Sequence, residues 1–546
     1  MPSLMELVER VNKGELIDAE PLEVYEDSPN SAEKFLAHHA HAMLDLRRAQ
    51  QHLLQSLEAI DYSDQKVLSQ FMSISGFLGL TDLRAGPVIR FGSSAIARRE
   101  YALGIEAIQN GIGFDLMHGG SFTSDRDNCI FVATQYERAA AGINWTNAEG
   151  VDWNNKQMRI AYIVSGIGDD DASGRAVRSL ARHHDDKRFK VGFYSTECGV
   201  RRDRQQFVQS IYAAPSSRRG TATLEMLKRE KVAHFLAPTD ADTVSAAKEL
   251  AAQLVKDRVD VAIFDAGQAD PIACIVANWN VARTKVNLVR RTPMFCGQVS
   301  GAIYFDQPRF EIDREYWQRR NIEAKFILEG MDVEDDLGAA PQRSAYGIPD
   351  NAVVLATCGT DLDKTLSDEF VDTLVNILRS HPHVICLLIG EGELSWQKRK
   401  FESAGVGKRV GYAGRRKDLP GFLRICDAYL AEFPASSTAG VLAAMSLAKP
   451  VLAMRWGEAI QHSQASDLVG PECTVAARDF DAFVERVSKL IRDPALRQRL
   501  GKSLKDRVRQ HYSFTQTARQ IEQFCEQLVQ GRCDAPAGGE AQAQAA

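Results

Sequence analysis

The sequence lacks any uncharged apolar run of about 18 residues, the length that a membrane-spanning helix needs. Its first twenty residues mix acidic and basic side chains and contain no apolar core typical of a secretion signal. The ten cysteines are scattered and form no Cys-x-x-Cys pair, which argues against a structural zinc site or a disulfide scaffold. We therefore expect no integral membrane segment and a reducing, cytoplasmic location.

An excess of positive charge is also missing. The chain has 66 Lys and Arg against 72 Asp and Glu, which gives a net charge of -6. Without a global basic field, the protein has no means of gathering nucleic acid, so we expect no nucleic-acid partner. Any anionic ligand must be held by a local pocket.

The length of 546 residues excludes a single compact core, because domains average roughly 150 residues. Apolar residues recur at helical spacing from Ser31 to about Ala141, which predicts an all-helical N-terminal domain over residues 1–156. Strand-like runs then alternate with amphipathic helices, as in RIAYIVSG, FKVGFYS and VDVAIFDAG, and predict a Rossmann-like half over residues 157–335. The alternation restarts at AVVLATCGT and predicts a second such half with closing helices over residues 336–530, before a disordered tail at 531–546.

Two Rossmann-like halves in tandem predict an α/β protein that binds its ligand in a cleft, at the carboxyl ends of the strands. Two predicted strand ends of the second half carry informative residues. In CGTDLDK, Gly359 and Thr360 form a turn before Lys364, which can reach a phosphate as a point charge. In EFPASSTAG, small hydroxyl residues open a helix whose N–H groups suit an anion, namely Ser436, Ser437 and Thr438.

Each of these segments has a simpler interpretation. The three hydroxyl residues can serve only as helix caps, and Lys364 can be an exposed surface lysine. Because the two segments end two strands of the same predicted sheet, we favour a phosphate-binding site.

The stretch Asp427–Ala453, DAYLAEFPASSTAGVLAAMSLAKPVLA, resembles the nucleotide-sugar-binding segment of GT-B glycosyltransferases. It is most similar to the protein glycosyltransferases related to O-GlcNAc transferase and to the bacterial cytoplasmic N-glycosyltransferases that modify adhesins. The residues that fall in the family's positions are Phe433, Pro434, Thr438, Gly440 and Pro450. LATCGTDLDKTLSDEFVDTLVNILRSHPH resembles the strand and helix that carry the family's diphosphate-binding lysine, which is Lys364 here.

This resemblance implies a bacterial GT-B enzyme that transfers a hexose or N-acetylhexosamine from a nucleotide diphosphate, UDP-linked, to a protein acceptor. Lys364 and the N–H groups around Ser437 and Thr438 would neutralise the leaving diphosphate without a metal or other cofactor. Gly414 and Arg415 would border the nucleotide base. In this group a helical module precedes the catalytic core and helps to select the acceptor, so the N-terminal domain would bind the acceptor or a partner. A homo- or hetero-oligomer remains open.

The chain departs from the family pattern in two places. Ala443 stands where many relatives hold the donor ribose with an acidic residue, and the paired-glutamate signature of the retaining enzymes is absent. The loop GIGDDDASGR has acidic residues where relatives of O-GlcNAc transferase have a histidine. We interpret Asp170 and Asp171 as candidates for the base that activates the acceptor.

Three alternatives stand beside this interpretation. The acidic loop, or Asp361 with Asp363, can instead hold a divalent cation on a diphosphate. The acceptor can be a glycan, a lipid-linked group or a small molecule. The chain can also be a partner subunit that keeps the GT-B fold and has lost the chemistry, as Ala443 and the missing histidine suggest.

Overall fold

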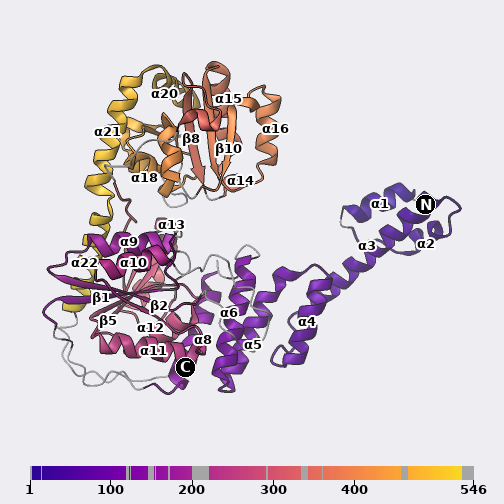
Figure 1. Ribbon diagram of the computed structural model, residues 1–546. Coiled ribbons are helices and arrows are strands. Elements are labelled where there is room, and N and C mark those ends of the chain that lie inside the picture. The colour runs from indigo at the N-terminus through magenta and orange to yellow at the C-terminus, as the bar shows by residue number, and fades with distance from the viewer. Residues whose placement is uncertain are drawn as a thin grey trace.

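The computed structural model describes residues 3–13, 15–117, 122, 125–145, 153, 155–169, 172–198, 220–290, 293–333, 342–359, 361–416, 419–456 and 465–531. A helical region comes first and is followed by two parallel β-sheets, each flanked by helices (Figure 1). The α/β architecture predicted from the sequence, with two Rossmann-like sheets behind an all-helical segment, is confirmed. None of the helices in these ranges is long and apolar enough to cross a bilayer.

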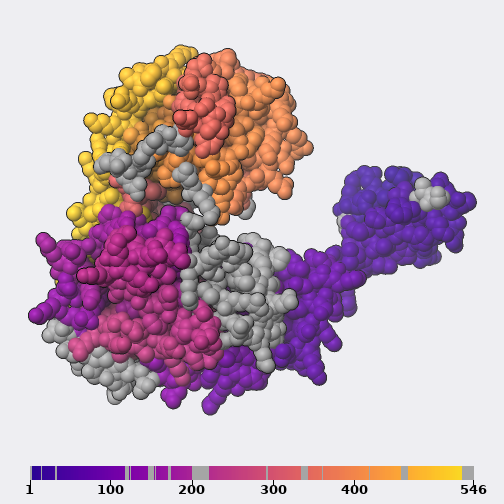
Figure 2. All heavy atoms as spheres, in the orientation of Figure 1, coloured from indigo at the N-terminus to yellow at the C-terminus, as the bar shows by residue number. Residues whose placement is uncertain are grey.

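The helical region begins with a small head. In this head α1 and α2 pack on the first half of α3 around Leu7, Leu22 and Leu44, and Figure 2 shows it standing apart from the rest of the molecule. Farther along, α5 and α6 cross closely, because a Cβ atom on Gly92 or Gly104 would lie 2.7 Å from the other glycine's carbonyl oxygen. The helices of this region are α1 Leu4–Asn12, α2 Glu20–Glu26, α3 Ser31–Ser56, α4 Gln65–Phe77, α5 Ala85–Ala97, α6 Tyr101–Met117 and α8 Arg126–Gly142.

The first sheet has the strand order β3-β2-β1-β4-β5-β6-β7, with all neighbours parallel. Helices α9 and α10 cover one face, and α11 and α12 cover the other. The helical region packs on the face that α11 and α12 cover. There Trp279, which follows α12, donates a hydrogen bond from Nε1 to the Ala140 carbonyl of α8 at 3.1 Å. The elements are β1 Met158–Val164, α9 Ala172–His183, β2 Phe189–Ser195, α10 Thr221–Arg229, β3 Ala233–Leu236, α11 Thr243–Lys256, β4 Val261–Asp265, α12 Pro271–Ala277, β5 Thr284–Val289, β6 Gly301–Tyr304, α13 Gln307–Arg319 and β7 Glu323–Phe326.

The second sheet has the strand order β10-β9-β8-β11-β12-β13 and is also parallel throughout. Its central strands are apolar and buried, as expected for a sheet covered by helices on both faces. The elements are β8 Val353–Gly359, α14 Leu362–Thr365, α15 Asp368–Ser380, β9 Val384–Gly390, α16 Ser395–Ser403, β10 Val410–Gly414, α17 Leu419–Ile425, β11 Ala428–Leu430, α18 Thr438–Ser446, β12 Val451–Met454, α19 Ala465–Val469, β13 Thr474–Val475, α20 Phe480–Arg492 and α21 Pro494–His511.

The final helix, α22 Phe514–Gly531, returns to the first sheet after α21 has packed on the second (Figure 1). Phe524 and Cys525 of α22 are buried among strands of the first sheet. Glu522 accepts the backbone N–H of Asp185 at 2.9 Å and lies 2.9 Å from Nδ1 of His184. The two sheet-containing halves are thus tied together by a segment more than 300 residues away in sequence from the first strand.

Candidate functional site

The carboxyl edge of the second sheet collects the segments that the sequence singled out. β8 ends at Gly359, β10 ends at Gly414, and the loop after β11 leads to Ser436 and Ser437 before α18 begins. Because the strands are parallel, these ends lie on one edge of the sheet, and Figure 1 shows α14 and α18 on the side of this half that is turned toward the first half. The structure therefore brings the predicted donor-binding segments together.

The turns after β8 and β9 pack directly on each other. A Cβ atom on Gly390, whose φ is +156°, would overlap the carbonyl oxygen of Gly359, so no other residue fits at this position. The backbone N–H of Leu362 donates to the Glu391 carbonyl at 2.8 Å. These contacts fix the backbone where the first predicted phosphate-binding segment leaves its strand.

The first turn of α18 approaches β8 equally closely. Ser437 is the N-cap and its Oγ accepts the N–H of Gly440 at 3.2 Å. A Cβ atom on Gly440 would lie 2.7 Å from Tyr429 Oη and still closer to Cys358 Sγ. Tyr429 Oη in turn accepts the N–H of Cys358 and donates to its carbonyl, both at 3.2 Å. Ser437 does cap α18, as the simpler interpretation predicts. The N-terminus of α18 also lies beside the end of β8, so an anion bound there would contact both segments.

Lys364 lies in α14, immediately after this turn, and only its backbone belongs to the described residues. Thr360 lies outside them. The neighbouring acid Asp363 accepts the N–H groups of Glu393 and Leu394 at 2.8 and 2.9 Å. Its carboxylate therefore orders the loop after β9.

Arg415 projects from the end of β10 and pairs with Glu391 at 3.3 Å, with both side chains well exposed. The pair joins the loops after β9 and β10 at the rim of the edge. Such an exposed ion pair adds little stability, so its guanidinium can exchange partners readily. This placement is compatible with the predicted position of Gly414 and Arg415 beside a bound base.

The candidate bases Asp170 and Asp171 fall outside the described residues. Their neighbour Asp169 is described and accepts the N–H groups of Thr223 and Ala222 at 2.7 and 3.2 Å, at the start of α10. Slight burial opposes the charged form, but these hydrogen bonds outweigh it and lower the pKa of Asp169 below its usual value. Among the described residues, no group of three or more His, Cys, Asp or Glu side chains is arranged to hold a metal ion.

One residue at this edge was missed by the sequence analysis. Glu432 follows β11 and is only 3% exposed, and neither of its carboxylate oxygens has a hydrogen-bond partner of ordinary geometry in the structure. Burial raises its pKa to about 7, although the nearby Thr357 hydroxyl and Ser437 N–H act in the opposite direction. The only signal in the sequence was an acid placed directly after the apolar run AYLA.

The carboxyl edge of the first sheet holds a partly buried charged cluster. Arg290, just after β5, donates to Asp265 at the end of β4 at 2.7 Å and to Glu329 at 2.6 Å. Burial disfavours the charged guanidinium, but the two carboxylates outweigh it and raise the pKa of Arg290. The cluster links the end of β4 to the segments that follow β5 and β7 on this edge.

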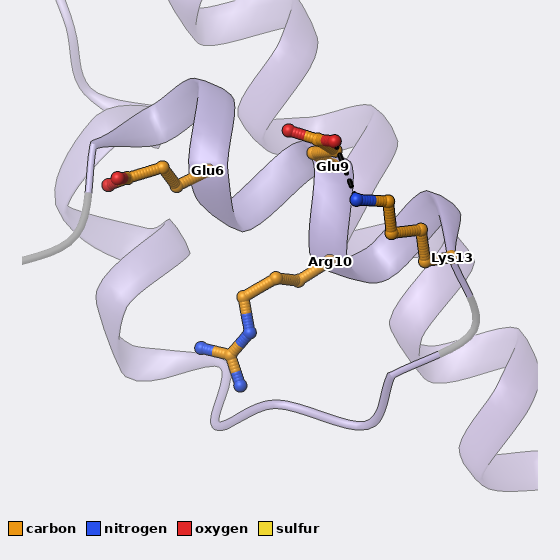
Figure 3. A pocket seen from close by; sticks show the side chains of 4 residues that line it. All are labelled: Glu6, Glu9, Arg10 and Lys13. Carbon is orange, nitrogen blue, oxygen red and sulfur yellow. Dashed lines mark hydrogen bonds and ion pairs between the residues drawn. The ribbon is translucent and has the colours of Figure 1, made fainter.

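A hollow beside α1 is lined by Glu6, Glu9, Arg10 and Lys13 and lies in the N-terminal head, away from both sheets (Figure 3). Lys13 pairs with Glu9 at 2.7 Å, and Glu6 accepts the N–H of Ser3 at 2.7 Å as part of a helix cap. Its charged groups are thus engaged locally, and the hollow is a surface feature of the head.

Comparisons with known proteins agree with this geometry. Residues 353–493 match the family model of glycosyl transferases group 1, a stretch that runs from the start of β8 to the end of α20. No protein of curated function matches the sequence.

Among solved structures, an O-GlcNAc transferase mutant of Thermobaculum terrenum is similar with a TM-score of 0.53 and 15% identity, over 97% of this chain and 100% of that chain. A glycosyltransferase from Rickettsia africae has a TM-score of 0.49 and 13% identity, over 69% and 99% of the two chains. HepE of Anabaena, solved with UDP and glucose, has a TM-score of 0.46 and 14% identity, over 68% and 100%. This protein thus has the GT-B fold, residues 353–493 of its second half match the glycosyl transferases group 1 model, and together these findings support glycosyl transfer as its general activity.

Proposed function

We propose that this protein transfers a hexose or N-acetylhexosamine from a UDP-linked donor to a protein acceptor, without a metal ion. The observation that carries the proposal is the meeting of two segments at one sheet edge, where the start of α18 packs against the end of β8 beside α14. Helix N-termini favour anions because their first N–H groups lack intrahelical acceptors. The diphosphate of the donor is the anion that such an edge would hold.

In the reaction, the bond between the sugar and the diphosphate breaks while the acceptor attacks the sugar carbon. Negative charge then grows on the leaving diphosphate, and groups fixed in advance around it lower the barrier. The N–H groups around Ser437 and Thr438 and the ammonium group of Lys364 supply this stabilisation. Gly414 and Arg415 border the base, and Asp170 or Asp171 takes the proton from the acceptor.

Two features support the absence of a metal from this mechanism. Asp363, half of the acidic Asp361-Leu-Asp363 pair, already accepts two backbone N–H groups from the loop after β9. A lysine and a helix N-terminus also supply positive potential of the kind that a divalent cation would otherwise bring to a diphosphate.

The helical region supports the choice of a protein as acceptor. The similarity to the Thermobaculum terrenum O-GlcNAc transferase extends over 97% of this chain, so it includes α1 to α8 as well as the two sheets. In Figure 1 these helices continue from the first half and are drawn apart from α14 and α18 of the second half. A protein segment bound along this region would need only to reach across to the donor.

The first experiment is a thermal-shift panel of nucleoside diphosphates and nucleotide sugars, with and without Mg²⁺. A ligand present at about 100 times its dissociation constant adds roughly 2.7 kcal/mol to stability. We expect a metal-independent shift with UDP compounds that is lost in Lys364→Ala and kept in Lys408→Ala. Lys408 is a matched control because it is exposed and precedes β10, at the opposite edge of the same sheet. A shift that depends on Mg²⁺, or that survives Lys364→Ala, would contradict the proposed donor site.

The acceptor class is tested separately with a donor that carries a labelled sugar. The label should appear in protein that is precipitated with acid and should be released as glycopeptides after proteolysis. Label recovered only in lipid extracts or free glycans would overturn the protein acceptor while leaving the donor site intact. No thermal shift with any nucleotide would instead favour a partner subunit without catalytic activity.

A further inference from the structure

The feature that the proposed function leaves unused is Glu432, which lies between the two segments of the donor site. It follows β11 by two residues, and its Oε1 atom lies 3.6 Å from the position that a Cβ atom on Gly359 would occupy. It also lies close enough to the backbone N–H of Ser437 for that group to lower its pKa. The carboxyl group therefore lies next to both segments that we propose bind the phosphates, the turn after β8 and the start of α18.

This carboxyl group is buried without a partner that would stabilise a negative charge. Neither oxygen of Glu432 accepts a well-formed hydrogen bond, and the Thr357 hydroxyl beside it is likewise buried and unpartnered. No basic side chain among the described residues forms an ion pair with it. Burying an unpaired carboxylate is costly, so burial favours the protonated form of Glu432.

The other ionisable groups on the strands around Glu432 are neutral near pH 7. Burial, and then the charge of Glu432, raises the pKa of the Cys358 thiol on β8 to about 12. Burial also raises the pKa of the Tyr429 phenol on β11 well above its usual value. Neither group changes charge in the range where Glu432 titrates.

Asp363 and Glu391, two charged groups on the surrounding loops, are engaged elsewhere. Asp363 on α14 accepts two N–H groups from the loop after β9, and Glu391 in that loop pairs with Arg415. The described first turn of α18, from Thr438 to Val441, contains no ionisable side chain. Lys364 on α14 is described only in its backbone.

We propose that Glu432 is a positioning residue of the donor site that works in its protonated form, so that a nucleotide-sugar diphosphate binds together with one proton. The inference rests on the proposed donor site. A carboxylate beneath two phosphate groups would repel them, since like charges in one site disfavour each other. The neutral acid instead keeps the two segments at their observed separation and has an O–H to donate. On binding, the carboxylate takes a proton from solvent and no other bond changes.

The test measures the affinity for UDP-glucose and UDP-N-acetylglucosamine between about pH 5.5 and 8.5. These probes are suitable because a diphosphate esterified at both ends has no group that titrates in this range, unlike free UDP. For the wild-type protein we expect the dissociation constant to rise by about tenfold per pH unit above pH 7, the limit for uptake of one proton.

The variant Glu432→Gln keeps the size and neutrality of the acid, so its affinity should be independent of pH. At about pH 8 it should bind roughly tenfold more tightly than the wild type. Glu369→Gln is the matched control, because Glu369 is an exposed acid on α15 of the same half, and it should follow the wild type at every pH.

Calorimetry in buffers of different ionisation enthalpy provides a second readout that needs no variant. Near pH 8 the wild type should take up close to one proton per donor bound. An affinity that does not change with pH and no proton uptake, with binding intact, would overturn the role of Glu432 and leave the proposed function standing. The same pH dependence in Glu432→Gln would also overturn it. Failure of the wild type to bind either probe at any pH would overturn the donor site itself.

Discussion

Gly440 is a residue at which a single added methyl group should disturb the donor site. Its Cβ atom in Gly440→Ala would lie 2.7 Å from Tyr429 Oη and closer still to Cys358 Sγ, whereas an ordinary contact is about 3.5 Å or more. Tyr429 cannot swing aside without giving up its two hydrogen bonds to the backbone of Cys358. The first turn of α18 must therefore move away from β8 by about 1 Å.

The expected change in the free energy of unfolding of Gly440→Ala is the sum of two opposing terms. Alanine in place of glycine inside a helix gains up to about 1 kcal/mol. Overpacking a well-packed contact costs about 1–3 kcal/mol. Because Tyr429 is held by its hydrogen bonds to the Cys358 backbone, we expect the cost of overpacking to exceed the gain in helix propensity. The free energy of unfolding should therefore fall by about 1–2 kcal/mol. Donor affinity should fall by tenfold or more, because a displacement of about 1 Å is severe at such a site.

The assay is urea unfolding together with titration of UDP compounds. Ala439→Ser is the control, since it adds one atom to the exposed side of the same helical turn and should cost no more than about 0.5 kcal/mol. In a Cys358→Ala background the cost of Gly440→Ala should be smaller by about 1 kcal/mol, as expected for residues in contact. A Gly440→Ala protein that is as stable as the wild type, or a cost that is the same in both backgrounds, would refute the reasoning.

Three further predictions concern stability. The pKa of Glu432 rises in the folded state from 4.5 to about 7 because of burial, so folding takes up a proton and the free energy of unfolding should fall by about 3 kcal/mol between pH 4.5 and 7. Urea unfolding at several pH values should show Glu432→Gln gaining stability over the wild type as pH rises, and a constant difference would contradict this. Glu522→Ala should lose about 1–3 kcal/mol, because it leaves the buried His184 ring and the Asp185 N–H without their acceptor; no loss of stability in the same assay would count against it. Phe524→Ala should cost about 3–5 kcal/mol, since the ring is fully buried under the first sheet, and calorimetric unfolding that leaves the first half unaffected would contradict that placement.

Much of the fold could be predicted from local patterns. The alternation of apolar runs and amphipathic helices locates both parallel sheets, because the central strands β1, β4, β8 and β9 are apolar along most of their length. The same patterns place Gly359 at the end of one strand and Ser437 at the start of the helix that follows another, and parallel strands bring such segments to one edge. The parallel arrangement of the strands therefore explains why the donor-binding segments lie at the same edge of the sheet.

Other features depend on tertiary contacts that no local pattern contains. The return of α22 to the first sheet rests on Glu522 meeting His184, 338 residues away. Glu432 reads in the sequence as an ordinary polar residue after a strand, and only the packing of β8, β11 and α18 around it makes it a buried acid without a partner. The close approach of Gly440 to Cys358 is likewise a property of the assembled sheet.

The most direct test of the donor site is amide hydrogen exchange of the wild-type protein, followed by mass spectrometry, with and without a UDP-sugar. We predict slower exchange in two segments, residues 357–366 and 436–442, together with the turn at Gly414 and Arg415. The amino edge of the same sheet, around Lys408, should not change. Protection confined to the first sheet or to the helical head, or no protection at a concentration that shifts the melting temperature, would contradict the assignment of donor binding to the carboxyl edge of the second sheet.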